Sequence, residues 1–518
     1  MKVVTVEQMR RIEQRSEGAG VSMDALMENA GLSVARRTTQ MLDGVRGKRV
    51  IVLVGRGNNG GDGMVAARYL SDWGALVTLY MTSPRRREDK FEECRTRRVR
   101  VVEGRDDQDL WVLSNYLPLT DLVMDAVLGT GQDGPLDQSL QALFTKICET
   151  QRAGQGFKLV AVDVPTGVNA DTGMVDDVCP KMDLTITLGA PKVGLFQFPA
   201  ANYVGPLETV SIGLPEGVDT DVSLELADGP LVASLLPARP LDSHKGTFGH
   251  VLAVAGSREY IGASVLTCLG AYRAGAGLVT LASPSGTYRL AASQMAETTY
   301  LPLDETPEGH VAPAGAMAVR QALAAATAGV IGPGLGHSAA VQAFIQAALL
   351  VDPPPETPVV LDADALNALA ETPRWWEWLH TSAVLTPHPG ELSRLLRSTV
   401  PAVQADRLNA TKQAAEAWGQ VVVLKGAYTV VAGPEGQATL SPFANPALAS
   451  GGTGDVLSGV IGALLAQGLS PYNAAVAGVH LHGSAGEQVR SELGDAGLIA
   501  TDLLSELPRV MRALREGG

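Results

Sequence analysis

The sequence has few of the features that mark membrane, secreted or nucleic-acid-binding proteins. Its four cysteines form no C-x-x-C pair, which argues against a local metal site or a disulfide framework and fits a reducing compartment. It has no secretory signal and no run of about 18 or more apolar residues. The 41 basic and 55 acidic residues give a net charge of −14, which disfavours nucleic acid as the main partner. We therefore expect a cytoplasmic protein without membrane or nucleic-acid partners.

Composition places the chain among globular proteins with several domains. Hydrophobic residues make up 46% and charged residues 19%, a balance that supplies buried cores and excludes wholesale disorder. At roughly 150 residues per domain, the length predicts two to four domains. The 57 glycines and 30 prolines indicate many tight loops.

Apolar β-branched runs alternate with helical patterns in two successive blocks, as is typical of parallel sheets covered on both faces. The first block has strand-like runs at 48–54, 75–81, 121–127, 158–164, 184–189 and 208–214, with helical patterns at 64–74 and 139–152. The second block has strand-like runs at 250–256, 277–283, 329–334, 358–364, 383–389 and 421–426, a hairpin at 428–442 and an apolar helix at 453–468. We expect an α/β fold for each block, doubly wound in the first.

The stretch from Pro215 to about Lys245 is rich in proline and acidic residues and interrupts this alternation. We place a domain boundary within it, which gives one domain over 1–222 and another over 223–518. The two blocks are not an obvious sequence repeat of each other.

A glycine-rich segment, GRGNNGGDG at 55–63, lies between a predicted strand and a predicted helix, where backbone N–H groups attract phosphate. It lacks the G-x-G-x-x-G spacing of a dinucleotide fingerprint and the lysine of a Walker loop. A tight turn would explain the glycines alone. Asn58, Asn59 and Asp62 favour a ligand site, because a turn needs at most one such residue. Their side chains can bind a hard cation or ligand hydroxyls.

Polar residues also follow other strands of the first block. Asp125 and Asp163 lie at the carboxyl ends of predicted strands, the edge at which open α/β sheets bind ligands. Asp163 could instead cap a helix or form a loop. Lys192 ends another strand; for a lone lysine a solvated loop charge would be an equally good interpretation, and the neighbouring strand-end residues argue against it.

In the second block, ASGGTGDVLSG at 449–459 places Asp455 in the first turn of an apolar helix, behind three glycines. Backbone amides at a helix N-terminus stabilise charge on a phosphoryl group in transfer, and a carboxylate beside them can accept a proton from an attacking hydroxyl. The acid could also simply complement the helix dipole. We favour catalysis because of the surrounding glycines.

Other segments of the second block end strands with glycine, lysine or histidine. LKGAYT at 424–429 suits contact with a nucleotide, and IGPGLG at 331–336 is a further glycine turn. His388 lies between two prolines in TPHPGE and is expected to contact substrate. His480 and His482 are expected on different faces of a helix, and we assign them no role.

The motifs NPALASGGTGDVLSG, LKGAYT, DADALNAL and TPHPGE closely resemble those of the ribokinase-like, ADP- or ATP-dependent dehydratase of hydrated NADH and NADPH. GNNGGDG, DAVLGTG, DVPTGVNADTG and LMENAG resemble the epimerase that partners it. The resemblance covers nearly the whole chain. It implies a Rossmann-like three-layer epimerase domain followed by a ribokinase-like dehydratase domain, as in bifunctional nicotinamide nucleotide repair enzymes.

For the first domain, the resemblance implies a potassium site formed by Asn59, Asp125 and Thr166, and it makes Asp163 the residue that moves the proton. The substrate is expected to contact Asp163 and two loops, namely Asn58, Asn59, Gly60, Gly61, Asp62, Gly129, Thr130, Gly131, Gln132, Asp133, Gly134 and Pro135. The C6 hydroxyl would leave with help from the ring nitrogen and return to the opposite face.

For the second domain, Asp455 would deprotonate the C6 hydroxyl for attack on the terminal phosphate of the nucleotide, and phosphate would then be eliminated. ADP or ATP, with magnesium, is expected to contact Lys425, Gly426, Ala427, Tyr428, Thr429 and Gly454. The hydrated cofactor is expected to contact Ala263, Gly336, His388 and Asp455.

Two alternatives remain open from the sequence. A vitamin or sugar kinase would share the GGTGD segment, but it would release a stable phosphorylated product. The first domain could be a non-catalytic binding module, although Asn59, Asp125 and Asp163 argue against this. We also expect a homo-oligomer.

Overall fold

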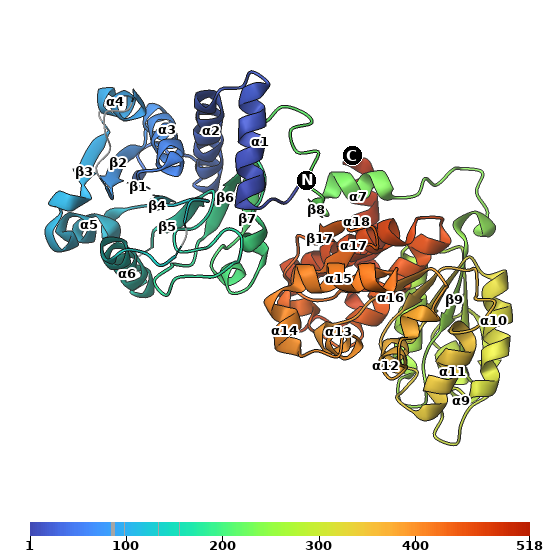
Figure 1. Ribbon diagram of the computed structural model, residues 1–518. Helices are drawn as coiled ribbons and strands as arrows, with labels where there is room; N and C mark the ends of the chain where they lie inside the picture. Colours follow the sequence, from blue (N-terminus) through green and yellow to red (C-terminus); the bar gives the residue numbers. More distant parts are fainter. Residues whose placement is uncertain (84–88, 98, 133, 155, 518) are drawn as a thin grey trace. The chain divides into compact units, whose positions relative to one another are not determined.

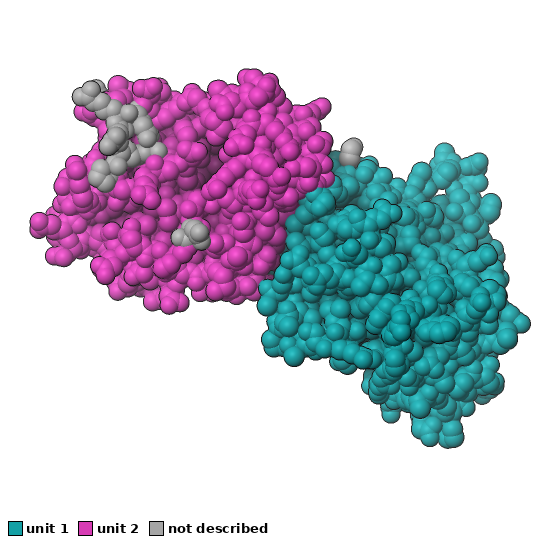
Figure 2. All heavy atoms as spheres, viewed as in Figure 1, with its two compact units in different colours: residues 1, 223–518 teal, residues 2–222 magenta. Residues whose placement is uncertain are grey.

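The computed structural model describes residues 1–83, 89–97, 99–132, 134–154 and 156–517, and the chain divides into two compact units. Figure 2 shows the N-terminal unit, Lys2–Val222, and the C-terminal unit, Ser223–Gly518 together with Met1. Within the described ranges, no helix is both long and apolar enough to cross a membrane. The cysteines Cys94, Cys148, Cys179 and Cys268 are free thiols.

The N-terminal unit is built on a parallel sheet in the order β3-β2-β1-β4-β5-β6-β7 (Figure 1). The order reverses between β1 and β4, and the crevice at such a switch point is where doubly wound folds bind ligands. The strands are β1 (Arg49–Val54), β2 (Leu76–Met81), β3 (Arg100–Glu103), β4 (Leu122–Ala126), β5 (Lys158–Val162), β6 (Leu184–Leu188) and β7 (Leu207–Val210).

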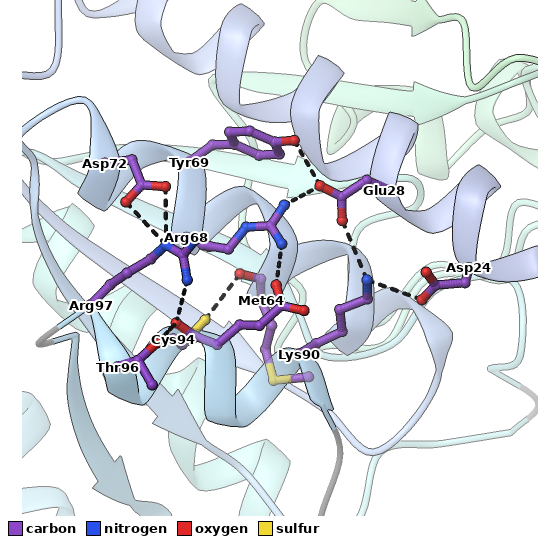
Figure 3. Close-up of polar contacts among 11 residues, drawn as sticks. Asp24, Glu28, Met64, Arg68, Tyr69, Asp72, Lys90, Cys94, Thr96 and Arg97 are labelled. Atoms are coloured by element: carbon purple, nitrogen blue, oxygen red, sulfur yellow. Dashed lines mark hydrogen bonds and ion pairs between the residues drawn. The ribbon is translucent and has the colours of Figure 1, made fainter.

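Helices cover both faces of this sheet and give three layers. One core contains side chains of α1 (Val6–Gly18), α2 (Met23–Met41), α3 (Asn58–Asp72) and α4 (Asp89–Thr96). The opposite core contains side chains of α5 (Trp111–Tyr116) and α6 (Gln138–Arg152). Figure 3 shows how the Arg68 guanidinium of α3 binds Glu28 of α2 and Glu93 of α4. The ion pairs of this buried arginine therefore connect α3 with both α2 and α4.

The C-terminal unit has a larger sheet in the order β11-β10-β9-β12-β13-β14-β15-β16-β17-β8. Neighbours pair in parallel from β11 to β15, whereas β15, β16 and β17 form an antiparallel meander. The strands are β8 (Leu224–Leu226), β9 (His250–Val254), β10 (Leu278–Pro284), β11 (Thr299–Leu303), β12 (Ala328–Ile331), β13 (Val359–Leu361), β14 (Ala383–Leu385), β15 (Val421–Leu424), β16 (Val430–Ala432) and β17 (Ala438–Leu440).

One core of the C-terminal unit contains apolar side chains of α8, α16, α17 and α18 together with those of the strands. The nearly all-apolar α16 lies against β9, β12 and β13, which places its N-terminus near the carboxyl ends of these strands. The helices are α7 (Gly229–Leu235), α8 (Ile261–Arg273), α9 (Ser285–Ala292), α10 (Ala316–Ala325), α11 (Ala339–Leu349), α12 (Asp364–Ala370), α13 (Pro389–Leu395), α14 (Val400–Ala405), α15 (Arg407–Trp418), α16 (Thr453–Ala466), α17 (Pro471–Leu493) and α18 (Asp502–Glu516).

The structure departs from the sequence prediction at a few elements. The helix predicted at 64–74 begins already at Asn58, so the glycine-rich segment is itself helical. The stretch 215–245 is not all linker, because it contains β8 and α7 of the C-terminal unit. The predicted hairpin is present as β16 and β17.

Candidate active sites

Asn59, a buried residue in the first turn of α3, lies near the switch point of the N-terminal sheet between β1 and β4. Its Nδ2 donates to the Leu128 carbonyl at 3.0 Å. Its Oδ1 is buried and accepts no hydrogen bond from the described residues. A Cβ on Gly129 would lie 3.2 Å from the Asn59 Cβ, so the loop after β4 closes tightly on this side chain. An amide oxygen without a protein partner at this depth favours a polar ligand or a cation as its partner.

Asp125, near the end of β4, is fully buried and lies beside Thr166. Its carboxylate accepts the Thr166 hydroxyl at 2.7 Å, the Thr166 backbone N–H at 2.8 Å and the Val127 N–H at 3.2 Å. Burial raises the pKa of Asp125 to about 6, because these hydrogen bonds offset only part of the lost hydration. A cation at this place would compensate the buried charge.

Asp163 follows β5 directly and has a left-handed backbone, with φ 66°. The Val164 N–H bonds the Val162 carbonyl across it at 2.9 Å, which is the hydrogen bond of a γ-turn, and a positive φ marks the rare, strained form. A non-glycine residue held in such a conformation is a mark of functional sites. The turn redirects the Asp163 side chain toward β6.

A buried ion pair orients the Asp163 carboxylate. Its Oδ1 accepts the Thr187 hydroxyl at 3.1 Å, the Leu188 N–H at 3.0 Å and the Lys192 ammonium. Lys192 is 1% exposed, so the alternative of a solvated loop charge is wrong. In the described part of the chain Oδ2 accepts no hydrogen bond, and it is the oxygen left for a substrate proton.

The glycines of the 55–63 segment have a structural role that was not anticipated. A Cβ on Gly63 would lie 2.4 Å from the Ala126 Cβ, so this glycine lets α3 pack closely on β4. A Cβ on Gly61 would meet the end of the Met27 side chain at 2.6 Å. These two glycines are explained by helix packing, and close approach to a ligand is not needed to account for them.

The loop after β4 is exposed at Gly131, Gly134 and Pro135. It is anchored by Gln132, whose Oε1 accepts the Gly167 N–H at 2.7 Å, and this joins the loop to the segment that follows Asp163. Asp133 lies outside the described residues. Asp62 is buried within α3.

In the C-terminal unit, Asp455 occupies the first turn of α16, as the sequence predicts. Gly452 precedes the helix with φ 89°, a left-handed conformation that favours glycine. Burial, then the nearby Asp362 carboxylate, raise the pKa of Asp455 to about 7, while Lys425 lowers it. The side chain can therefore accept a proton near neutral pH.

Lys425 follows β15 and links the residues around Asp455. Its ammonium lies 2.6 Å from Oδ1 of Asp362, whose Oδ2 accepts the Ser458 hydroxyl of α16 at 2.6 Å. A Cβ on Gly454 would lie 3.5 Å from the same ammonium. The positive end of α16 and the lysine thus meet where a nucleotide phosphate could bind.

His388 and Glu391 form a capping box at the start of α13. The His388 Nδ1 accepts the Gly390 N–H at 3.0 Å, and the His388 N–H donates to Oε2 of Glu391 at 2.8 Å. That glutamate oxygen is 4.0 Å from the Lys425 ammonium. Burial raises the pKa of Glu391 to about 7, an effect that Lys425 opposes. Because Nδ1 is an acceptor, the neutral histidine carries its proton on Nε2, which lies 3.5 Å from Oε1 of Glu391 on a half-exposed side chain.

The remaining predicted contacts surround this centre. The Gly336 N–H donates to Oδ2 of Asp364 at 2.8 Å, close in the chain to Asp362. Ala263 of α8 approaches the same glycine loop, because a Cβ on Gly334 would lie 2.7 Å from its Cβ. Thr429 is buried, and its hydroxyl closes the turn on the Gly426 carbonyl at 2.8 Å. Its hydroxyl is therefore already used within the protein.

Gly426 is the exposed residue of the same turn, Ala427 and Tyr428 are partly buried, and Tyr428 has φ 50°. Arg407 of α15 donates to the carbonyls of Leu424 and Lys425 at 3.1 and 3.2 Å and fixes the turn from behind. Burial lowers the pKa of Arg407 to about 10.

His480 and His482 are both buried and bonded, although no role could be assigned to them from the sequence. The His482 ring nitrogen Nε2 lies 2.9 Å from the Thr453 carbonyl in the first turn of α16. The His480 Nδ1 lies 2.6 Å from the Ala227 carbonyl. His482 therefore supports the helix that carries Asp455.

Comparisons with known proteins agree with this two-unit arrangement. Residues 23–194 match the family described as YjeF-related protein N-terminus, and residues 251–509 match NAD(P)H-hydrate dehydratase. The bifunctional NAD(P)H-hydrate repair enzyme Nnr of Moorella thermoacetica is 38% identical over 100% of this chain and 98% of its own length. The enzyme of the same name from Escherichia coli is 37% identical over 89% of this chain and 84% of its own length.

A solved structure is also similar to part of the chain. The ADP/ATP-dependent NAD(P)H-hydrate dehydratase from Bacillus subtilis, co-crystallised with ATP and Mg²⁺, is 34% identical, covers 56% of this chain and 98% of its own, and has a TM-score of 0.48. The expected α/β class is confirmed by the two mainly parallel sheets, and the strand order of the N-terminal unit is doubly wound. From its full-length relatives and both family matches, the chain belongs to the family of bifunctional NAD(P)H-hydrate repair enzymes.

Proposed function

We propose that the two units catalyse successive steps in the repair of hydrated NADH and NADPH. The N-terminal unit interconverts the R and S forms at C6, and the C-terminal unit converts the S form back to NAD(P)H with ADP or ATP. The observation that carries the second assignment is Asp455, a partly buried carboxylate with a pKa near 7 at the start of α16, beside Lys425.

In the dehydratase unit, Asp455 accepts the proton of the C6 hydroxyl as its oxygen attacks the terminal phosphorus of the nucleotide. The bond from that phosphorus to the bridging oxygen breaks, and ADP or AMP leaves. The ring-nitrogen lone pair then expels phosphate from C6, and loss of a proton from C5 restores the dihydropyridine. Lys425 and the N-terminus of α16 at Gly454 stabilise the negative charge on the transferring group.

The nucleotide binds along the turn at Lys425, Gly426, Ala427, Tyr428 and Thr429, and the hydrated cofactor binds against Ala263, Gly336 and His388. Magnesium accompanies the phosphates. Among the described residues, no group of three acidic, histidine or cysteine side chains is arranged to hold a metal. This fits an ion bound mainly by phosphate oxygens, as is common for magnesium.

In the epimerase unit, Asp163 moves the proton. Its Oδ1 is engaged by Lys192 and two other donors, so Oδ2 meets the C6 hydroxyl. Asp163 gives a proton to that hydroxyl, and the ring-nitrogen lone pair helps the resulting water to leave C6. A water molecule then adds to the other face of C6 and returns a proton to Asp163. Lys192 is a positioning residue, because it fixes the carboxylate without reaching the substrate.

Potassium fits the crevice beside Asp163. The unpartnered Oδ1 of Asn59, the buried Asp125 carboxylate and the Thr166 hydroxyl supply the oxygen ligands that hard cations prefer. When bound, the ion would neutralise Asp125 and attract the substrate phosphates. Asp125→Asn should therefore raise the potassium concentration needed for half-maximal epimerisation, and unchanged potassium dependence would contradict this ligand set.

The two assignments can be tested with a mixture of R and S hydrates, following recovery of NADH absorbance with ADP or ATP. Asp163→Asn should consume the S form and then stall, apart from slow spontaneous inversion of the R form. Asp455→Asn should recover no NADH but still interconvert the epimers. Complete consumption by Asp163→Asn at the wild-type rate, or accumulation of a stable phosphorylated product, would contradict the proposal.

A cytoplasmic location and a homo-oligomeric state also belong to this proposal. Light scattering of the purified full-length chain measures the second directly, and a monomeric mass at assay concentrations would contradict it.

A further inference from the structure

A cavity of about 520 Å³ lies at the amino end of the N-terminal sheet. Arg49 begins β1 beside Leu76, and Arg100 begins β3 beside Thr78. Five residue steps, roughly 17 Å, separate Arg49 from Val54 at the carboxyl edge of the sheet, where the epimerase residues lie. The cavity is therefore separate from the epimerase site.

Three arginines line this cavity in a chain with a net charge of −14. The Arg100 guanidinium stacks on the Tyr116 ring, 4.7 Å from its centroid, and in the described residues it has no hydrogen bond or ion pair. Within the described ranges, the Arg49 guanidinium donates only to the Leu119 carbonyl, at 3.4 Å. Both groups are oriented by a neighbour and keep most of their donors available.

In the part of the chain that the structure describes, the carboxylates near these two groups are bound mainly by other partners. Asp72 is bound by the third arginine, Arg97, whose Nε lies 3.1 Å from both carboxylate oxygens (Figure 3). Asp121 accepts the backbone N–H of Arg49 at 2.8 Å and pairs with Lys48 at 3.3 Å. The Arg49 backbone N–H, the Lys48 ammonium and the charge of Arg49 lower the pKa of Asp121, so this carboxylate offsets part of the Arg49 charge. Among the described residues, neither guanidinium has a carboxylate within ion-pair distance.

The rest of the cavity is largely apolar. Leu76 and Leu119, on its rim, are 59% and 56% exposed, and buried Val50 and Val77 lie behind them. The volume lies in the range of small-molecule sites, which combine an apolar lining with a few polar anchors. Arginine is suited to bidentate binding of phosphate.

We propose that this cavity binds a phosphorylated metabolite of nucleotide size. Arg49 and Arg100 bind the phosphate, and the wall formed with Leu76 and Leu119 receives the uncharged body. A nucleoside monophosphate and a sugar phosphate share this chemistry. The site is additional to the two catalytic sites and does not depend on their assignment.

Equilibrium dialysis of the full-length chain with AMP and with ribose 5-phosphate tests the proposal. The wild type should bind one equivalent of one probe that the Arg49→Gln/Arg100→Gln variant binds at least about tenfold more weakly, since a hydrogen bond to a charged group contributes that much or more. Preference for AMP identifies a nucleotide ligand, and preference for ribose 5-phosphate identifies a sugar phosphate. Both catalytic activities should be unchanged, which shows that the variant folds.

Arg95→Gln is the matched control, because this exposed arginine of α4 pairs with Glu92 at 3.0 Å and does not line the cavity. It should bind the probe as the wild type does. An equal loss of probe affinity in Arg95→Gln would mean that the overall surface charge, and not this cavity, determines binding. That result would overturn the proposed site. Binding of neither probe, unchanged binding by the double variant, or inorganic phosphate binding as tightly as either probe would also overturn it.

Discussion

Replacing Asp455 with asparagine should abolish dehydration and stabilise the protein at the same time. The native carboxylate is partly buried near Asp362, and its pKa is about 7 against an ordinary value of 3.8. A charge held in such surroundings destabilises the fold, because the unfolded chain ionises more easily than the folded one. The asparagine side chain of the Asp455→Asn variant would have no charge to bury, and Lys425 would keep Asp362 and Glu391 as partners.

The size of the effect follows from the difference between the two pKa values. A folded-state pKa above the unfolded value means that the folded protein binds the proton more tightly, so stability falls as pH rises from 3.8 toward 7. Above pH 7 the loss reaches on the order of 4 kcal/mol, at about 1.4 kcal/mol for each pKa unit. At pH 5 the folded carboxyl is protonated, and less than half of that loss has developed.

Urea unfolding of the full-length chain at pH 8 and pH 5 measures this difference. Asp455→Asn should gain on the order of 4 kcal/mol at pH 8 and less than half of that at pH 5. Asp495→Asn, at an exposed aspartate paired with Arg490, is the control and should show little change at either pH. The dehydratase rate should fall by about 10² to 10⁴ fold. In the wild type, kcat/KM should rise with pH through about 7. Equal stability of wild type and variant at pH 8 would refute the reasoning.

Three further predictions concern single side chains. Lys192→Met should destabilise the N-terminal unit by about 3 to 5 kcal/mol in urea, because it leaves the Asp163 carboxylate without its buried partner, and adding Asp163→Asn should restore part of the loss. Gly63→Ala should lower stability by about 1 to 3 kcal/mol through overpacking, whereas Gly454→Ala should leave stability intact and raise the KM for ATP. Ala363→Gly should raise stability by about 1 kcal/mol, because φ 49° and ψ −113° strain any residue with a Cβ.

The strand framework could be predicted because most strands are nearly continuous apolar runs. Arg49–Val54 and Val421–Leu424 are buried along almost their whole length, which leaves little ambiguity. The strands that escaped prediction, Arg100–Glu103, Leu224–Leu226 and Thr299–Leu303, are short and only partly buried. A strand at or near a sheet edge needs no continuous apolar run, so its sequence gives no periodic signal.

The aspartates were predictable, but their partners were not. Asp163 and Asp455 follow a strand or open a helix within distinctive local segments. Lys192 pairs with an aspartate 29 residues away, and Asp362 pairs with Lys425 across 63 residues. Such pairs depend on which strand ends come close together at one edge of the sheet. The proximity of Glu391 to Lys425 was not predicted for another reason. The sequence around Glu391 is that of an ordinary capping box, and only the structure places Lys425 near it.

Glycine-rich helix starts serve different purposes in the two units, although they look alike in sequence. In α3, the missing Cβ of Gly63 lets the helix lie against Ala126, which brings the start of α3 close to the end of β4. Gly452 supplies a positive φ before α16, and the missing side chain of Gly454 leaves space beside the Lys425 ammonium. The candidate site of the N-terminal unit therefore depends on close packing between α3 and β4. The candidate site of the C-terminal unit depends instead on the backbone conformation and the open space at the start of α16. The neighbouring atoms decide which purpose a glycine serves, and only the fold supplies them.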